Sequence, residues 1–439
     1  MEISILRLIR KSAYLIQKIA TKMSNFSGKV VNKSTRIITG VDPTLSNNKT
    51  TTLERLYYGK IPLIKPIMPA MPAVGSKPTV TLFIPSLDGS SFFGGAATAL
   101  VVSAKLAIQS KRQLKIVQTV KTGKPNDLKK FFKSEGIDAD NLDIKVISVA
   151  DRAYNIYGYI PMHKDDIFIA SAWWDVHVID QLPIDKFIYL VQDFEPIFYN
   201  NSDEYVMAEQ TYKSKKAIPL CNTKLMYDFM KQQNYPAFAG KNVFYFEPAV
   251  SRAKSGLVQQ KNDGEKKKLF LYGRINVERN LFFTALNAIN RAIDKGYLKT
   301  NEFELFMAGQ DGISDITLSN GAIIKNLGKM NMEDYIKFSK TIDIAISPMM
   351  APHPNYPTLE FASIGSTVVT TKYANKQSLE NYSKNIFMSD LDVESMTNTI
   401  KQAVKKTDAQ KTVDLKSNNI NTNWDESLDT VISNVLKSF

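Results

Sequence analysis

Cysteine and histidine are both scarce in this chain of 439 residues, which contains one cysteine, Cys221, and three histidines. A single cysteine excludes a disulfide framework within the chain and favours a reducing compartment. One cysteine and three histidines also leave almost no material for a structural zinc site. The chemistry of the protein must therefore be sought in other side chains.

Long apolar runs are missing as well. No uninterrupted apolar segment approaches the roughly 20 residues that a membrane-spanning helix needs. Charges interrupt the apolar residues near the N-terminus, and no small-residue cleavage site follows them as in a secretory signal. The chain is 44% hydrophobic and 23% charged, which is typical of a globular protein. We expect a cytoplasmic protein, and its length indicates two domains.

Positive charge is concentrated in the first part of the chain. Residues 1–76 hold twelve basic and three acidic residues, so they carry +9 of the net charge of +13. Residues 1–23 repeat apolar side chains near helical spacing, with basic residues between them. Such a helix could lie on an anionic membrane, with residues 1–40 as the contact, or pack on the protein's own body. Nucleic-acid binding is a weaker alternative, because this segment lacks a recognised reading motif.

Strand-like and helix-like segments alternate after residue 78, and this alternation predicts parallel sheets with helices on both faces. We therefore predict an α/β protein with two doubly wound, Rossmann-like domains. The predicted strands are 79–85, 114–120, 142–149, 166–172 and 186–193 in the first half, and 269–273, 303–309, 322–328, 342–348 and 366–371 in the second.

Composition sets the predicted boundaries. Prolines at five positions between 62 and 78 predict an extended linker, and the lysine-rich stretch 251–268 predicts a second linker between the domains. The final segment is amphipathic and opens with Asn-Trp-Asp, a helix start signal. The predicted division is an extension at 1–76, a first domain at 77–255, a second at 256–420, and a helix at 421–439 that docks on the first domain.

The stretch FLYGRINVERN contains a candidate anion site. Ligands of open α/β sheets bind beyond the carboxyl ends of the strands. Gly273 and Arg274 follow a predicted strand, and Arg279 and Asn280 stand at the start of the next helix. Guanidinium groups bind phosphate oxygens through planar, charge-assisted hydrogen bonds, and a helix N-terminus supports them. The alternative is a pair of surface arginines bonded to carbonyls or to Glu278.

The loop after predicted strand 342–348 supplies further candidates. Thr358, Leu359 and Glu360 open a helix there. The Glu360 carboxylate is predicted to accept the hydroxyl protons of a ribose, as acidic groups do in dinucleotide folds, or else to cap the helix. His353 in this loop is a candidate donor to a phosphate or a sugar.

The first half offers residues of a different kind. Gly94 and Gly95 form a predicted turn after strand 79–85, where small residues let backbone amides approach a phosphate or sugar. Trp173 and Trp174 end another strand and could form a platform for a sugar ring, although we expect one of them in the core.

Three segments together make the chain similar to a known enzyme family. They are GRINVERN, YLVQDFEPIFYNNSDEYVMAEQTY and SPMMAPHPNYPTLEFASIG. The chain resembles the retaining GT-B glycosyltransferases over roughly residues 77–439, and most closely the bacterial S-layer glycan rhamnosyltransferases of glycosyltransferase family 4. The resemblance implies a GT-B fold with two Rossmann-like domains facing across a cleft. The C-terminal half would hold a nucleotide-sugar donor, and the N-terminal half a glycan or lipid-linked glycan acceptor.

The resemblance also assigns donor residues. Arg274 matches the strand-end arginine beside the diphosphate, and Arg279 stands where a lysine commonly serves as the second cation. Glu360 matches the last carboxylate of the family's E-x7-E motif, which holds the ribose. The first glutamate of that motif is missing, because Pro352 and then His353 occupy its place. This departure leaves the contacts to the sugar open.

Gln192 and Asp193 stand at the strand end where many relatives have His-Asp near the transferred sugar. Asp193 is therefore the candidate carboxylate for orienting the acceptor hydroxyl or the sugar, and Gln192 a candidate acceptor contact. Residues 138–140 and 390–392 have the Asp-x-Asp spelling of metal-dependent transferases. Neither follows a convincing strand, so we expect no required metal and no other cofactor.

The function implied is retaining, metal-independent transfer of a sugar, with L-rhamnose from dTDP-rhamnose as the best estimate, to a growing cell-surface glycan. Preorganised cations and amides would stabilise the negative charge that develops on the leaving nucleoside diphosphate. The alternative is a catalytically inactive GT-B scaffold that binds a glycan or a nucleotide.

Overall fold

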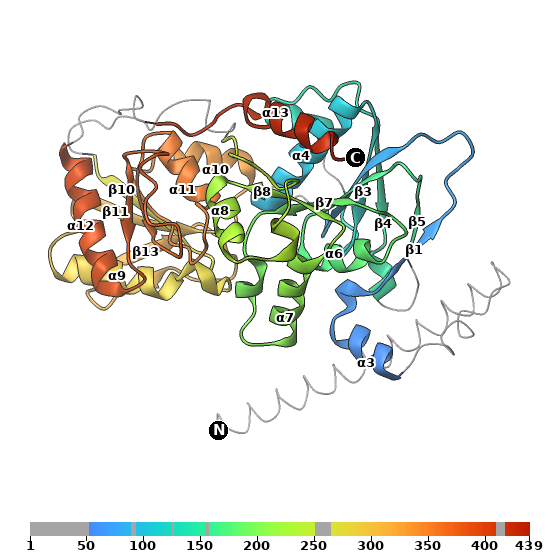
Figure 1. The fold of residues 1–439 in the computed structure, drawn as a ribbon. Coiled ribbons are helices and arrows are strands. Elements are labelled where there is room, and N and C mark those ends of the chain that lie inside the picture. The colour runs from blue at the N-terminus through green and yellow to red at the C-terminus, as the bar shows by residue number, and fades with distance from the viewer. Residues whose placement is uncertain (1–51, 89–93, 125–126, 154–157, 251–264, 410–417) are drawn as a thin grey trace.

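The computed structural model describes residues 52–88, 94–124, 127–153, 158–250, 265–409 and 418–439 (Figure 1). They form two α/β domains, each built on a seven-stranded sheet. The predicted fold class is confirmed. The predicted N-terminal helix and the predicted boundary at 255 lie outside the described residues.

All strands of the first sheet are parallel, in the order β4-β3-β2-β6-β7-β8-β9. The strands are β2 (Thr79–Ile84), β3 (Gln113–Gln118), β4 (Ile144–Ser148), β6 (Ile167–Ala170), β7 (Phe187–Val191), β8 (Ala217–Asn222) and β9 (Phe244–Phe246). The α-helices are α3 (Thr52–Lys60), α4 (Gly94–Ser110), α5 (Leu128–Ser134), α6 (Trp173–Asp180), α7 (Asp203–Gln210) and α8 (Lys224–Gln232), and the short 3-10 helices are η1 (Pro62–Ile64), η3 (Ala150–Ala153), η4 (Glu195–Phe198), η5 (Thr211–Lys213) and η6 (Pro236–Phe238).

The side chains of β2 alternate between two cores. Val80, Leu82 and Ile84 pack with α4 and α5 on one face, and Phe83 packs with α6 and α8 on the other. Successive strand residues point to opposite faces, so a strand that is buried throughout requires cover on both. The carboxyl ends of the strands are thereby left as the edge where loops can form a site.

The proline-rich stretch is part of the first domain and not a free linker. Its strand β1 (Ile67–Ala70) pairs in parallel with β5 (Gly158–Pro161), and Ile61 and Ile64 are buried against Trp173. The buried guanidinium of Arg152 donates hydrogen bonds to backbone carbonyls of this stretch, at Leu63 and Lys65. The predicted boundary at residue 76 is therefore too late, because these contacts fix the chain from about Ile61 onward.

The second sheet has the order β12-β13-β11-β10-β14-β15-β16, in which only the short strand β12 is antiparallel to its neighbour. The strands are β10 (Lys267–Tyr272), β11 (Phe303–Ala308), β12 (Ile316–Thr317), β13 (Ile323–Asn326), β14 (Ile344–Ile346), β15 (Thr367–Thr371) and β16 (Ile386–Ser389). The helices are η8 (Glu278–Asn280), α9 (Phe282–Asp294), α10 (Met332–Ser339), α11 (Tyr356–Ser363) and α12 (Val393–Ala409). Since β10 begins at Lys267, the last residues of the predicted interdomain linker belong to a strand.

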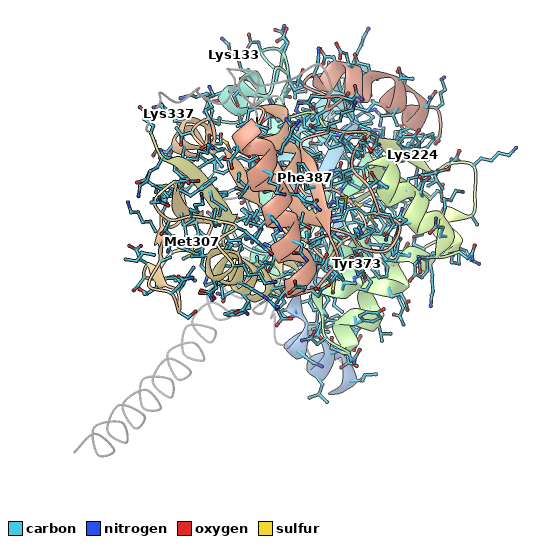
Figure 2. The ribbon with its side chains drawn as sticks, turned by 90° about the vertical axis from the view of Figure 1, so that its left-hand side faces the viewer. Lys133, Lys224, Met307, Lys337, Tyr373 and Phe387 are labelled. Carbon is cyan, nitrogen blue, oxygen red and sulfur yellow. The ribbon has the colours of Figure 1, made fainter. Side chains whose placement is uncertain are left out.

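Helices cover both faces of the second sheet as well. Leu269 and Leu271 pack with α9 and α12 on one face, and Phe270 packs with α11 on the other. Figure 2 views the molecule onto this domain, with α12 in front. In the part of the chain that the structure describes, no helix has both the length and the apolarity needed to cross a membrane.

The last helix, α13 (Trp424–Leu436), lies on the first domain beside α4 (Figure 1). Trp424, Leu428 and Ile432 are buried in the same core as α4, and Trp424 Nε1 donates to Glu135 Oε2 at 3.1 Å. The chain thus passes from the first domain to the second and returns to the first. This return holds the two domains next to each other through a second connection.

Candidate active site

The loops that follow β7 and β10 meet at the seam between the domains. Asp193, after β7, places Oδ2 3.2 Å from Arg279 Nε and 3.3 Å from His353 Nε2, both of the second domain. The Arg279 guanidinium also lies over the ring of Phe198, 4.0 Å from its centroid. Arg279 is therefore held between a carboxylate and an aromatic face of the first domain.

Asp193 is ionised in this setting. Burial alone would raise the pKa of its carboxyl group, but the charges of His353 and Arg279 and the backbone N–H of Phe194 hold that pKa below its ordinary value. A buried carboxylate stays charged only when cations and donors compensate it. The seam thus contains one anionic carboxylate of the first domain, with the Arg279 guanidinium and the His353 ring of the second domain beside it.

Unpartnered polar atoms are concentrated in and beside this seam. Buried polar atoms in proteins nearly always have a hydrogen-bond partner. Among the described residues, eight buried side-chain nitrogen and oxygen atoms make no hydrogen bond, and all except Trp174 Nε1 belong to seam residues, namely Gln192, Asn222, Arg279, Asn280, His353 and Asn375. The arrangement is that of a site prepared for a polar ligand.

The ion pairs of Asp193 are compatible with the absence of hydrogen-bond partners for Arg279 Nε and His353 Nε2. Arg279 Nε and His353 Nε2 lie within ion-pair distance of the Asp193 carboxylate, yet neither points at it with the geometry of a hydrogen bond. Their attraction to Asp193 is therefore electrostatic, and their N–H bonds remain available to another acceptor.

Gly94 and Gly95 form the first turn of α4 and not a separate turn as predicted. Gln192 Nε2 donates to the Gly95 carbonyl at 2.9 Å. A β-carbon on Gly95 would lie 3.2 Å from the same nitrogen, so a larger residue would press on Gln192. Gly95 thus allows the predicted acceptor residue Gln192 to sit against the start of α4, next to Asp193.

Tyr356 of the second domain forms a link to the first domain. Its hydroxyl forms hydrogen bonds with Thr98 of α4 and with Asn222 Nδ2, the latter at 3.2 Å. Burial raises the pKa of Tyr356 to about 12, so its proton stays on the hydroxyl at neutral pH. The sequence analysis missed Tyr356, because its partners lie far away in the chain.

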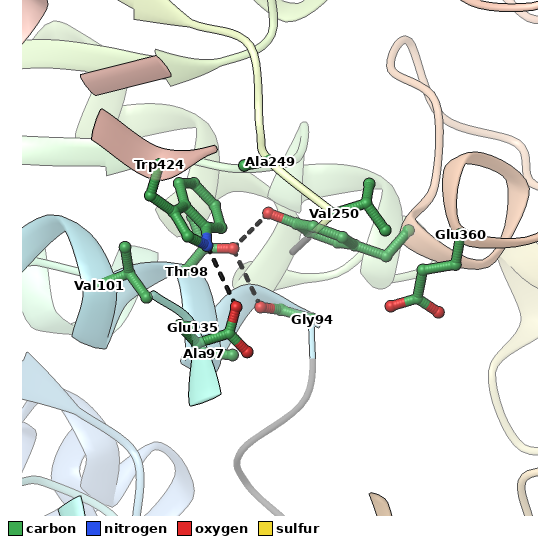
Figure 3. A pocket seen from close by; sticks show the side chains of 10 residues that line it. Gly94, Ala97, Thr98, Val101, Glu135, Ala249, Val250, Glu360 and Trp424 are labelled. Atoms are coloured by element: carbon green, nitrogen blue, oxygen red, sulfur yellow. Dashed lines mark hydrogen bonds between the residues drawn. The ribbon is translucent and has the colours of Figure 1, made fainter. Parts of the chain in front are cut away.

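Glu360 lines a pocket to which both domains contribute (Figure 3). Gly94, Thr98 and Trp424 contribute from the first domain, and Glu360 Oε2 accepts a hydrogen bond from the Tyr335 hydroxyl at 2.9 Å. Glu360 does not cap its helix, so that alternative is wrong.

Asn355 is the residue that caps α11. Its Oδ1 accepts from the Thr358 amide at 2.8 Å, and its carbonyl accepts from the Leu359 amide at 3.3 Å. The side chains of Thr358 and Leu359 are also buried in the domain. Both had been predicted to bind the donor, and in this conformation their side chains and amides are already occupied.

The two predicted donor arginines have different surroundings. Arg279 lies in the seam, whereas Arg274 is exposed at the end of β10 and makes no ion pair or side-chain hydrogen bond within the described part of the chain. Gly273 donates its amide to Ala308 and packs closely on Met307, so it serves the contact between β10 and β11. Asn280 is 1% exposed, and both polar atoms of its side chain are unpartnered.

Trp173 is a core residue and cannot serve as a sugar platform. It is 1% exposed, and its Nε1 donates to the Tyr199 hydroxyl at 2.9 Å. Trp174 is half-buried, packed edge-on against Trp173, so it is the member of the pair that keeps an accessible face. One of the two tryptophans was expected in the core, and it is Trp173.

The two Asp-x-Asp segments lie on the surface. Asp138 Oδ1 accepts from the amide of Asp140 in an exposed loop, Asp390 pairs with Lys372, and Asp392 accepts from the Ser395 amide at the start of α12. Across the described ranges, no group of three or more His, Cys, Asp or Glu side chains is placed to hold a metal ion.

Both domains match models of one family. Residues 79–224 match the model described as WsaF, N-terminal domain, and residues 267–401 match WsaF, C-terminal domain. The O-antigen biosynthesis protein RfbC of Myxococcus xanthus is 25% identical over 285 residues, which are 62% of this chain and 21% of that protein. The chain thus spans about a fifth of the length of this curated relative.

Solved structures share the fold at low sequence identity. Sucrose-phosphate synthase of Thermosynechococcus elongatus has a TM-score of 0.56 and 10% identity, covering 83% of this chain and all of that one. Anabaena HepE in complex with UDP has a TM-score of 0.53 and 12% identity, with coverage of 82% and 100%. A mutant of S. aureus TarM, in complex with fondaparinux, alpha-GlcNAc-glycerol and UDP, has a TM-score of 0.56 and 10% identity, with coverage of 82% and 99%. The chain belongs to the WsaF-like GT-B glycosyltransferases.

This WsaF-like chain also contains a buried acid beside Asp193 that the sequence analysis did not single out. Glu195 accepts the backbone N–H of Trp173 at 2.8 Å and is 6% exposed. Burial, together with the charges of Asp175 and Asp193, raises the pKa of Glu195 to about 8. Glu195 is therefore protonated at neutral pH, which leaves Asp193 as the ionised member of the neighbouring pair.

The raised pKa of Glu195 predicts a pH-dependent stability. Between about pH 4.5 and about pH 8 the unfolded chain is ionised at this residue and the folded chain is protonated. The folded state binds more protons, so this group lowers stability as pH rises through that window. Glu195→Gln keeps the acceptor for Trp173 and cannot ionise. We expect it to be more stable than the wild type at pH 8 by roughly 1–3 kcal/mol, with a smaller difference at pH 5.

Urea denaturation at both pH values measures this effect, with the exposed Glu278→Gln as the matched control. A difference between Glu195→Gln and wild type that does not change with pH would show that Glu195 is ionised in the folded protein.

Proposed function

We propose that the protein transfers a sugar from a nucleotide-sugar donor to a cell-surface glycan, with the chemistry at the seam between its domains. The observation that carries the proposal is the arrangement around Asp193. An arginine and a histidine of the second domain converge on one buried carboxylate of the first, amid buried polar atoms that make no hydrogen bond among the described residues. The name of RfbC, an O-antigen biosynthesis protein, and the UDP bound to HepE and to TarM agree with this proposal.

Before a donor binds, the Asp193 carboxylate lies within ion-pair distance of Arg279 and His353. A donor diphosphate offers these side chains more negative charge and more acceptor oxygens than one carboxylate does. When the glycosidic bond breaks, charge builds up on the leaving diphosphate, and fixed cations stabilise it without reorganisation. Asp193, released from its ion pairs, is then free to accept a hydrogen bond from a sugar hydroxyl of the donor or acceptor.

The finer assignments are also proposals. The donor is dTDP-rhamnose, the anomeric configuration is retained, and protein cations replace a metal ion at the diphosphate. The exposed guanidinium of Arg274 supports the last point, because it stands at the end of β10 and makes no ion pair with any residue that the structure describes. Glu360 and the Tyr335 hydroxyl are the proposed ribose contacts, and Trp174 with Gln192 the proposed acceptor contacts.

Removal of Arg274 tests the donor site. The thermal midpoint of the wild type would be measured with dTDP-, UDP- and GDP-sugars. We expect one of these nucleotides to raise it, because a ligand that binds the folded state stabilises it. Arg274→Ala should bind that nucleotide roughly 10- to 100-fold more weakly, since a hydrogen bond to a charged group contributes about 1.5–3 kcal/mol. Arg291→Ala, which removes an exposed arginine paired with Glu394, is the matched control.

Equal affinities of wild type and Arg274→Ala would contradict the placement of the diphosphate. Binding that is not followed by release of nucleoside diphosphate in the presence of candidate acceptor glycans would indicate a binding scaffold in place of an enzyme.

We also propose that residues 1–40 contact the anionic inner face of the cell membrane from the cytoplasm. These residues lie outside the described ranges, but α3, the first described helix, exposes Leu53, Leu56 and Tyr57. A polybasic segment gains about 1 kcal/mol per basic residue at an anionic surface. Exposed apolar side chains nearby can add to that attraction.

Substitution of the first basic residues tests this contact. Full-length protein should sediment with vesicles that contain phosphatidylglycerol and not with phosphatidylcholine vesicles. A variant with glutamine at positions 7, 10, 11 and 18 should lose most of that binding. Equal sedimentation of both proteins, or stronger binding to an oligonucleotide than to vesicles, would refute the membrane contact.

A further inference from the structure

A lysine of the second domain is buried beside the seam without an acidic partner. Lys376 is 0% exposed, and its Nζ donates to the Met349 carbonyl at 3.0 Å. None of the described acids lies within ion-pair distance of this ammonium, although Asp193 is close enough to act on its charge. Lysine is almost never fully buried unless it is paired, so the position needs a reason.

The turn that carries Lys376 is built into the seam. It follows β15, and Tyr373 and Lys376 exchange two backbone hydrogen bonds. Ala374 between them has a φ of 47°, an unusual value for a residue with a β-carbon. Asn375 reaches the first domain, where its Nδ2 donates to the Leu225 carbonyl at 2.8 Å. Tyr373, labelled in Figure 2, marks this turn.

The hydrogen bond to the Met349 carbonyl does not explain why a charged ammonium group is buried at this position. The Met349 carbonyl also accepts from Thr371 Oγ1 at 2.9 Å, so it would stay satisfied without the lysine. An apolar side chain of similar length would avoid the cost of burying a charge. The lysine therefore costs stability in the empty protein, a pattern typical of functional sites.

We propose that Lys376 is a positioning residue of the donor site. Its ammonium donates to the Met349 carbonyl of the loop 347–355, and its buried positive charge strengthens the binding of the diphosphate of a nucleotide sugar. This inference rests on the proposed function, because it takes that donor as the ligand. It adds to Arg279 a second positive charge, from a different loop of the second domain.

A dependence on pH follows from this role. Burial lowers the pKa of Lys376 to about 7, against the opposing influence of Asp193. The ionisable groups around this position are Asp193 of the first domain, which acts on the charge of Lys376, and Arg279 and His353 of the second domain, which lie beside Asp193. An anionic ligand favours the protonated lysine, so donor affinity should fall as pH rises through about 7.

Three variants distinguish an effect of the positive charge of Lys376 on donor binding from an effect of this residue on folding. Lys376→Met removes the charge and keeps the length, Lys376→Arg retains a charge at every pH of interest, and Lys372→Met removes a half-buried surface lysine of the same loop. The probe is dTDP-rhamnose or UDP-glucose, whichever binds the wild type, measured by calorimetry from pH 6 to pH 9. Diester phosphates do not titrate near neutral pH, so a change in affinity reports the protein.

We expect Lys376→Met to bind about tenfold more weakly than wild type at pH 6, since one buried charge interaction is lost. Its thermal midpoint without ligand should be equal to or above that of the wild type. Lys376→Arg should lose less affinity between pH 6 and pH 9 than the wild type does. Lys372→Met should follow the wild type throughout.

Unchanged affinity and an unchanged pH profile in a stably folded Lys376→Met would overturn the inference. A lower thermal midpoint with unchanged affinity would give Lys376 a purely structural role and would also overturn it. Absence of any nucleotide-sugar binding in the wild type would refute the proposed function itself, which is a different result from the failure of this residue.

Discussion

The ion pairs of Asp193 with Arg279 and His353 are the interaction on which the account of this site depends. They connect the two domains at the carboxyl ends of β7 and β10, and they keep a buried carboxylate ionised. Ion pairs of this kind gain little stability, because the cost of removing the charges from water offsets most of the attraction. In the proposed function, these ion pairs occupy Arg279 and His353 until a ligand with more negative charge binds.

The rest of the fold places these side chains opposite each other. The return of α13 to the first domain and the hydrogen bonds of Tyr356 with Thr98 and Asn222 bring the start of α11 to the start of α4. Glu195 stays protonated and adds no second negative charge near Asp193. The seam therefore brings one ionised carboxylate together with the Arg279 guanidinium and the His353 ring.

Hydrophobic pattern alone was sufficient for the fold class. Runs such as Thr79–Ile84 and Phe187–Val191 are rich in β-branched and apolar residues, as is typical of strands in a parallel sheet whose two faces are covered by helices. Strand β8 escaped prediction because Pro219 stands inside it, and proline normally argues against a central strand. The short strand β9 gave too weak a signal. The linker before the first domain was misjudged because proline-rich sequence does not reveal that Ile61 and Ile64 are buried.

Residues of the site could be predicted from the sequence only where they come soon after the carboxyl end of a strand. That rule placed Asp193, Arg279 and His353 among the candidates, although the pairing between them depends on how the domains meet. It misplaced Thr358 and Leu359, because the capping by Asn355 uses up their amides. The same rule could have singled out Lys376, which stands five residues after the end of β15. The sequence does not reveal that this lysine is buried, and its burial distinguishes it from the many lysines on the surface.

A double-mutant cycle between Asp193 and Arg279 tests the central claim most directly. Affinity for a nucleoside diphosphate without its sugar would be measured by calorimetry in wild type, Asp193→Asn, Arg279→Gln and the double variant. If Asp193 occupies the cations of the empty site, Asp193→Asn should bind several-fold more tightly than wild type, and this gain should vanish when Arg279 is absent. Weaker binding by Asp193→Asn, by the same factor with and without Arg279, would contradict the account.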